Sequence, residues 1–243
     1  MSEKIDIKLA STMLGVSMQT LRRWDSSKRL ISRRDGEGGH RYYFKFDLED
    51  FLFSNYTYLH KVASSWMFSS RIINSPFRFY CEDAYIFKAR LSKFERVLQD
   101  DKSIGDDFSL IVSSVGEIGN NAFDHNIGKW PDIPGLFFAY NLKERKVILG
   151  DRGQGVLATL RKVKPSLTND KDALKTAFNE VISGRYPENR GNGLKYVKKI
   201  IQETSLTLAF HSGNNIIKIK KKRKPSIKKA NENLRGCFII LGY

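Results

Sequence analysis

Near the start of the chain, apolar and polar residues follow the pattern of two short helices. Residues 7–14 predict a first helix that ends at Gly15. A second helix is expected from Met18 to about Ser26, with Ser17 as its cap. Two short helices joined by Gly-Val-Ser predict a helix-turn-helix in which Leu21 faces the core.

The next part of the chain predicts a hairpin and then further helices. Residues 33–43 are rich in glycine with basic residues on both arms, and a helix is expected from Asp47. Residues 54–83 are aromatic-rich and are treated as a connecting segment. A helical stripe at i, i+4, i+7 and i+11 follows, which predicts the first helix of a second domain in preference to a dimer seam; it consists of Phe87, Leu91, Phe94 and Leu98.

A second helical segment has an apolar face and a polar face. Its apolar stripe recurs with the same spacing and consists of Ile111, Val115, Ile118 and Ala122. Glu117, Asn121 and Asp124 share another face, and Asp106 or Asp107 can cap the start. An amide oxygen can bind Mg²⁺, and a carboxylate one turn away can orient or deprotonate an attacking group. The alternative is an ordinary solvated face.

Two glycine-containing segments lie further along the chain. Residues 146–150 predict a buried strand end, followed by Asp-x-Gly-x-Gly over 151–155. The Asp151 carboxylate can accept a hydrogen bond from an amino group beside backbone that a ligand can approach closely. Gly-Asn-Gly-Leu over 191–194 opens an amphipathic helix to Gln202, whose free N–H groups suit phosphate. Each segment alone is also compatible with a plain turn.

Together, Glu-x-x-x-Asn-Ala-x-x-His, Asp-x-Gly-x-Gly and Gly-x-Gly-Leu resemble the GHKL ATPase superfamily over roughly residues 80–243. The resemblance implies ATP and Mg²⁺ as ligands, with Glu117 as general base and Asn121 as magnesium ligand. It implies that the Asp151 carboxylate accepts a hydrogen bond from adenine. It implies a lid at 156–190. The remaining ATP-binding residues implied are Asp124, Gly153, Gly155, Arg190, Gly191, Asn192, Gly193 and Leu194, and Arg185 is a further candidate for the terminal phosphate.

The opening segment is nearest to that of the anti-sigma-factor serine kinases, so a protein serine/threonine kinase is an alternative to a slow ATPase. A non-catalytic ATP or ADP sensor is a second alternative. A histidine kinase is disfavoured, because no histidine has the sequence context of a phosphoacceptor. His60 lacks the Glu that follows such a histidine and the Pro further downstream.

The front fifty residues resemble the MerR and excisionase family. The resemblance rests on Gly-Val-Ser-x-x-Thr-Leu-Arg-Arg-Trp over 15–24 and Gly-Gly-His-Arg-Tyr over 38–42. It implies double-stranded DNA as partner, with the second helix in the major groove and the hairpin as a wing on the backbone. The DNA-binding residues implied are Gln19, Thr20, Arg22, Arg23, Arg34, His40, Arg41 and Tyr42.

Composition adds to this picture. A net charge of +16 indicates a polyanionic partner. Residues 218–229 are strongly basic and predict either a solvated loop or a second phosphate contact. Two distant cysteines predict free thiols in a reducing cytoplasm, and no signal peptide or membrane span is expected.

These patterns predict an α+β protein. A winged helix-turn-helix (1–53) and a connecting segment (54–83) precede a GHKL (Bergerat) sandwich (84–243) whose mixed sheet is covered by helices on one face. The expected function is a DNA-binding, nucleotide-controlled switch in transcription, defence or a mobile element. A homodimer and a protein partner are both possible.

Overall fold

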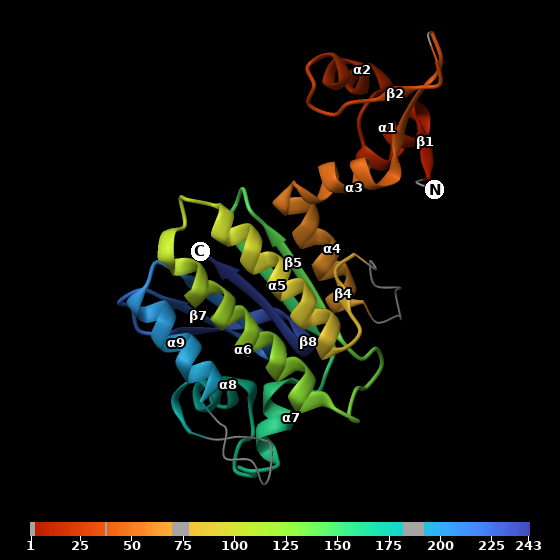
Figure 1. The fold of residues 1–243 in the computed structure, drawn as a ribbon. Coiled ribbons are helices and arrows are strands. Elements are labelled where there is room, and N and C mark those ends of the chain that lie inside the picture. The colour runs from red at the N-terminus through yellow and green to blue at the C-terminus, as the bar shows by residue number, and fades with distance from the viewer. Residues whose placement is uncertain (1–2, 37, 70–77, 182–191) are drawn as a thin grey trace. The chain divides into compact units, whose positions relative to one another are not determined.

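The computed structural model describes residues 3–36, 38–69, 78–181 and 192–243, and the fold is α+β (Figure 1). The chain divides into two compact units, Met1–Lys61 and Val62–Tyr243. Within the described ranges, no helix is long and apolar enough to cross a membrane. Cys81 and Cys237 are both free, as expected.

The first unit is a helix-turn-helix with a small sheet. Its elements are β1 (Lys4–Asp6), α1 (Ile7–Leu14), α2 (Met18–Ser26), β2 (Arg33–Arg34), β3 (Arg41–Phe44) and α3 (Lys45–Phe53). Gly15 ends α1 in the left-handed conformation (φ 64°), and the Ser17 hydroxyl caps α2 by accepting a hydrogen bond from the Thr20 N–H (3.1 Å). Both predicted helices are therefore confirmed, and Leu21 is fully buried.

The small sheet has the order β1-β3-β2 and is antiparallel throughout. Strand β1 adds a third strand that the sequence did not predict, because three residues are too few to show alternation. The apolar core of this unit is formed around Leu21, Tyr43 and Leu48. The strands β2 and β3 form the predicted hairpin.

The second unit is built on a five-stranded sheet of order β4-β5-β6-β8-β7. Its strands are β4 (Tyr80–Cys81), β5 (Leu136–Asn141), β6 (Lys146–Asp151), β7 (Thr207–Lys220) and β8 (Ser226–Gly242). Its helices are α4 (Tyr56–Phe68), whose first residues belong to the first unit, α5 (Ala84–Asp100), α6 (Phe108–Asn126), α7 (Gly155–Arg161), α8 (Asp170–Asn179) and α9 (Gly193–Glu203), with a 3₁₀ turn at Gly105–Asp107. Every described strand pairing is antiparallel, so the expectation of a mixed sheet is wrong for the described residues.

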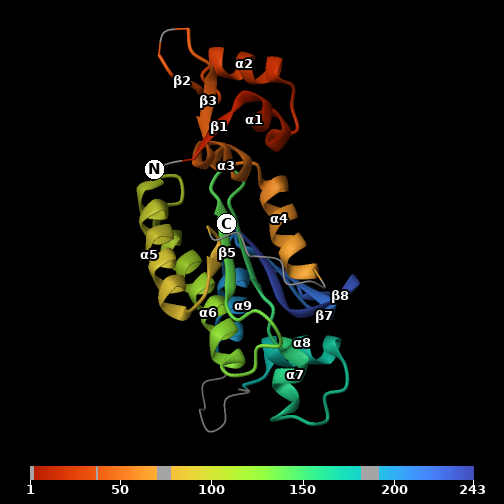
Figure 2. The same ribbon diagram turned by 90° about the vertical axis from the view of Figure 1, so that its right-hand side faces the viewer.

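The main core lies between one face of this sheet and helices α5, α6 and α9 (Figure 2). The predicted stripes of α5 and α6 enter this core, where Phe87, Phe94 and Val115 are fully buried. The stripe of α5 therefore belongs to the domain core rather than to a dimer seam. The expected cap of α6 is not formed, because Asp107 precedes the helix but makes no capping hydrogen bond through its side chain.

The other face of the sheet also carries a helix, contrary to the expectation of helices on one face only. Trp66, Met67 and Phe68 at the end of α4 pack on it, with the Trp66 ring centroid 6.0 Å from that of Phe137. The segment 54–83 is thus more than a connection, because it contributes α4 and β4 to the fold.

Two further segments expected from the sequence have defined secondary structure. The first 26 residues of the expected lid, 156–181, contain most of α7 and all of α8, which pack around Leu160 and Ala173, while 182–190 lie outside the described residues. The basic run 218–229 is only partly a loop, because β7 continues through Lys220 and β8 begins at Ser226, with a mostly exposed turn at 221–225 between them.

Candidate functional site

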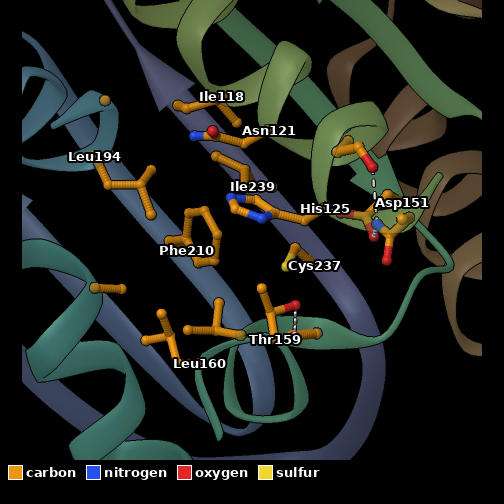
Figure 3. Close-up of a pocket in the computed structure, with 16 residues that line it drawn as sticks. Ile118, Asn121, His125, Asp151, Thr159, Leu160, Leu194, Phe210, Cys237 and Ile239 are labelled. Carbon is orange, nitrogen blue, oxygen red and sulfur yellow. Dashed lines mark hydrogen bonds between the residues drawn. The ribbon is translucent and has the colours of Figure 1, made fainter. Parts of the chain in front are cut away.

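An open cavity with about 780 Å³ of empty space lies between α6, the sheet, α7 and the start of α9 (Figure 3). This volume includes solvent space at the open mouth, and the cavity proper measures about 90 Å³. Figure 3 shows Asn121 and Leu194 toward one end and Asp151 at the other. It is lined by Ile118, Asn121, Ala122, His125, Asn126, Asp151, Gly155, Val156, Thr159, Leu160, Ala177, Gly193, Leu194, Phe210, Cys237 and Ile239.

Asp151 is the buried carboxylate of this cavity, with a relative exposure of 3%. It is the last residue of β6 and pairs with Cys237 of β8, on the face of the sheet that α6 covers. Its Oδ1 accepts hydrogen bonds from the Gly153 N–H (2.9 Å) and the Asn126 Nδ2 (3.3 Å). Burial raises the pKa of Asp151 to about 7, against the lowering effect of these donors and the Cys237 thiol. Oδ1 thus holds two donors, and the Cys237 thiol and N–H also act on this carboxylate.

Asn126 is a site residue that the sequence reasoning missed. Its Nδ2 donates to the Ala122 carbonyl (2.8 Å) as well as to Asp151, and its Oδ1 accepts from the Gln154 N–H (2.9 Å). A Cβ on Gly153 would lie 2.1 Å from the Asn126 amide nitrogen, so glycine is needed there. The amide therefore locks the Asp-x-Gly-x-Gly turn against the end of α6.

The polar face of α6 and the glycine segment that opens α9 meet at Glu117 and Gly193. A Cβ on Gly193 would lie only 2.4 Å from the Glu117 Oε2, so the start of α9 approaches this carboxylate as closely as a glycine permits. Glu117 itself is half-buried and does not line the cavity, whereas Gly193 and Asn121 do. The carboxylate thus lies at the border of the cavity, beside the helix N-terminus.

Of the other expected nucleotide-binding residues, Gly155 and Leu194 line the cavity, and Gly155 has a φ of 79° that suits glycine. Gly153 contributes its N–H to Asp151. Asp124 and Asn192 are not among the lining residues. Arg185, Arg190 and Gly191 lie outside the described residues.

The wall between the two polar ends of the cavity is largely apolar. Phe210 and Ile239 of the sheet, Leu160 of α7 and Ile118 of α6 contribute to it. The sequence did not predict that these residues line one cavity, because each lies on a different element. Such a wall suits the flat faces of an aromatic base.

In the first unit, α2 presents a polar surface. Gln19, Arg22 and Arg23 are exposed on it. Thr20 is half-buried, and its hydroxyl lies 3.0 Å from that of Ser17. Thr20 therefore takes part in the cap of the helix as well as lying on the expected recognition surface.

The hairpin brings the expected wing residues together but uses one of them internally. The Arg41 Nε donates to the Asp25 carboxylate (3.0 Å), with the two side chains 25% and 19% exposed. Burial opposes ionisation of Asp25, but hydrogen bonds from Ser32 and Arg41 hold its pKa below the usual value. Arg41 thus ties the hairpin to α2.

Two other wing residues remain at the surface. Arg34 and His40 are exposed, and the Arg34 guanidinium donates to the Gly39 carbonyl (3.1 Å), which braces the tip of the hairpin. Tyr42 is half-buried with the Lys4 ammonium 4.4 Å from its ring centroid. Lys4 is a neighbouring cation that the sequence reasoning did not include.

A family model and one curated protein match parts of this chain. Residues 6–43 match the model of the MerR family regulatory proteins. A 77-residue stretch is 31% identical to the type II methyltransferase M.Eco47II of Escherichia coli, which is 32% of this chain and 18% of that protein. The chain therefore corresponds to less than a fifth of the length of this curated relative.

Among solved structures, the ATPase region of topoisomerase II from Saccharomyces cerevisiae is similar over 53% of this chain and 36% of that one, with 16% identity and a TM-score of 0.34. A likeness at this level carries no functional conclusion. Residues 6–43 are a MerR-type helix-turn-helix, joined in one chain to an α+β unit that contains the cavity.

Proposed function

We propose that this chain is a DNA-binding protein whose second unit binds ATP with Mg²⁺ as a nucleotide-controlled switch. The observation that carries the proposal is the convergence of three distant segments, 117–126, 151–155 and 193–194, at one cavity with a buried carboxylate. Their chemistry, rather than their sequence order alone, suits a nucleotide.

Each segment has a part in the proposed binding. The Asp151 carboxylate accepts a hydrogen bond from the exocyclic amino group of adenine, while the apolar wall holds the ring. The N–H groups at the start of α9 face the phosphates, and Gly193 permits close approach. Phosphate contacts of Arg185, Arg190 and Gly191 stay predictions.

The donor set also fits magnesium. Asn121 lines the cavity and offers an amide oxygen, which Mg²⁺ accepts alongside phosphate oxygens and water. When bound, Mg²⁺ neutralises charge on the phosphates. Glu117, at the border of the cavity, would position or deprotonate the attacking water.

For the first unit, the MerR-type helix-turn-helix supports binding of duplex DNA through Gln19, Thr20, Arg22 and Arg23. In the hairpin wing, contacts with the DNA backbone are proposed for Arg34, His40 and Tyr42. Arg41 is proposed to contribute through the guanidinium N–H groups that do not bind Asp25. Similarity to part of a type II methyltransferase favours a DNA-directed component of a defence system among the processes considered.

The test of nucleotide binding is a comparison of wild type with Asp151→Asn, and with Asp106→Asn as an exposed control. An Asn at 151 would accept from Gly153 and Asn126 through its oxygen and turn its NH₂ toward the adenine amino group. We expect ATP affinity to fall by about 10- to 100-fold, measured by calorimetry, because a donor then faces a donor. Unchanged ATP affinity in Asp151→Asn would contradict the proposed contact between Asp151 and adenine.

Hydrolysis is tested separately with Glu117→Ala. We expect ATP binding to persist and release of phosphate to fall by about 100-fold or more. An Ala variant as active as wild type would exclude Glu117 as the base. Transfer of labelled phosphate to a protein would instead support the serine/threonine kinase alternative, and binding without any turnover would support a sensor.

A further inference from the structure

The hairpin formed by the ends of β7 and β8 carries an unusual concentration of positive charge. Its basic residues are Lys218, Lys220, Lys221, Lys222, Arg223, Lys224, Lys228 and Lys229, and no Asp or Glu stands between Glu203 and Glu232. All eight are exposed. Within the described part of the chain, none of them forms an ion pair. We call residues 218–229 the basic hairpin.

The two arms of the basic hairpin are paired strands, and a mostly exposed turn at 221–225 joins them. Ile217 and Ile219 alternate with its lysines and are buried at 1% and 0% exposure, which anchors one face in the main core. Lys218 pairs with Ser226, and Ile217 with Ile227, across the two strands. Strand alternation therefore places Lys218, Lys220 and Lys228 on the opposite, outward face.

The tip is also held in place. The Lys222 N–H donates to the Gln202 carbonyl near the end of α9 (3.2 Å), and Lys222 adopts a φ of 51°. The Gln202 amide donates to the Arg223 carbonyl (3.5 Å). Figure 1 shows β7 beside α9, in agreement with these contacts. Because the backbone of the hairpin is already ordered, binding a polyanion need not order it again.

We propose that the basic hairpin is a second contact with the phosphate backbone of duplex DNA, made by the nucleotide-binding unit itself. The inference rests on the proposed DNA binding of the first unit, since DNA held there raises the local phosphate concentration for any second contact in the same chain. It extends the proposed function by making the second unit a DNA-contacting part. Its contribution is electrostatic and independent of sequence.

The test uses the full-length protein and a mixed-sequence duplex of about 30 base pairs, without nucleotide. The hairpin variant is K220Q/K221Q/R223Q/K224Q, which keeps Lys222 because of its left-handed backbone. The control K88Q/K93Q/R96Q/K102Q removes the same four charges from exposed positions on and after α5. Fluorescence anisotropy gives the dissociation constant at salt concentrations from about 50 to about 200 mM, a range over which binding through phosphate contacts weakens strongly.

We expect the hairpin variant to bind DNA about 10-fold or more weakly at the lowest salt. The slope of log K against log salt should lose about 0.9 for each phosphate contact removed. The control should keep the wild-type slope to within one contact. Equal slopes for wild type and the hairpin variant, or equal losses in the hairpin variant and the control, would overturn the proposal.

A second pair of variants separates this inference from the proposed function. R22A/R23A weakens the helix-turn-helix contact, and its remaining DNA binding should disappear when the hairpin changes are added. If R22A/R23A binds DNA like wild type, the proposed role of α2 fails while the hairpin result still stands. If the hairpin changes leave DNA binding intact but abolish binding to phosphatidylserine vesicles, the hairpin binds lipid and the inference is wrong.

Discussion

At the scale of single residues, the buried carboxylate of Asp151 lowers the stability of the fold when it is ionised. Its carboxylate is buried in the sheet face under α6, where its pKa is raised to about 7 by burial. A buried carboxylate with a raised pKa lowers stability wherever it is ionised, so a neutral residue there would suit folding better. Retention of such a group at a cavity is typical of a binding site.

The pH dependence of stability follows from this pKa. Between the ordinary carboxyl value of 3.8 and about 7, the folded state binds more protons than the unfolded state. Stability therefore falls as pH rises through this window, and the loss is complete above about pH 7. We expect Asp151→Asn, without nucleotide, to melt roughly 3–10 °C above wild type at pH 8 and much closer to it at pH 5. Differential scanning calorimetry checks this; a gap independent of pH would contradict the burial argument.

Gly193 provides a second prediction at this scale. The Cβ of Gly193→Ala would lie 2.4 Å from the Glu117 Oε2, and the flexible end of Glu117 must move away. We expect the turnover of ATP to fall by about 10-fold or more, since a small displacement of a catalytic group is costly. Melting temperature should change by only a few degrees. Gly116→Ala, on the same helix as Glu117 and with its Cβ 3.3 Å from the Leu91 side chain, serves as the packing control and should retain turnover.

At the scale of elements, the end of α4 is bound to the residue that follows Asp151. The buried Arg152 guanidinium donates to the Trp66 carbonyl (2.5 Å), the Ser69 carbonyl (3.0 Å) and the Asp132 carboxylate (2.7 Å). The same Asp132 also pairs with Arg235, which is 51% exposed. Arg152 thus joins α4, the loop before β5 and the turn of the cavity.

The two arginines on Asp132 give a matched comparison. Arg152→Met removes a buried partner and leaves two helix-end carbonyls unsatisfied, so we expect a loss of about 3–5 kcal/mol in unfolding free energy. Arg235→Met removes an exposed partner and should cost less than about 1 kcal/mol. Urea unfolding of both variants checks this. Similar losses for the two would contradict a special role of Arg152.

Much of this level was predictable where the signal is local. Helices α1 and α2 have the predicted bounds, because Gly15 and Ser17 mark their ends, and the stripes of α5 and α6 indicated their buried faces. Arg152 was not predictable, because its partner Trp66 is 86 residues away. A contact of that kind is fixed by topology rather than by local pattern.

Two features had local signals that were overlooked. Asn126 stands one turn after Ala122 and continues the apolar stripe of α6, so a polar residue on that stripe indicated a specific buried contact. In the basic hairpin, Ile217 and Ile219 alternate with lysines, which indicates a strand despite the charge. The nucleotide-binding roles of residues in 117–126, 151–155 and 193–194 stay predictions.

At the scale of the whole molecule, the chain combines a MerR-type helix-turn-helix with a unit that contains a cavity lined by Asp151, Asn121 and Gly193. The boundary between the two units falls within α4, whose end Arg152 holds. If nucleotide and DNA are linked, each must change the affinity of the other by the same factor. That reciprocity is the central claim of the switch.

The most direct test measures DNA affinity with and without ATP and Mg²⁺, and ATP affinity with and without DNA, in wild type and Asp151→Asn. We predict that nucleotide shifts wild-type DNA affinity by about 5- to 150-fold in one direction, with an equal shift in the reciprocal titration. Asp151→Asn should lose the shift at ATP concentrations that saturate wild type. ATP binding that leaves DNA affinity unchanged in wild type would contradict the account.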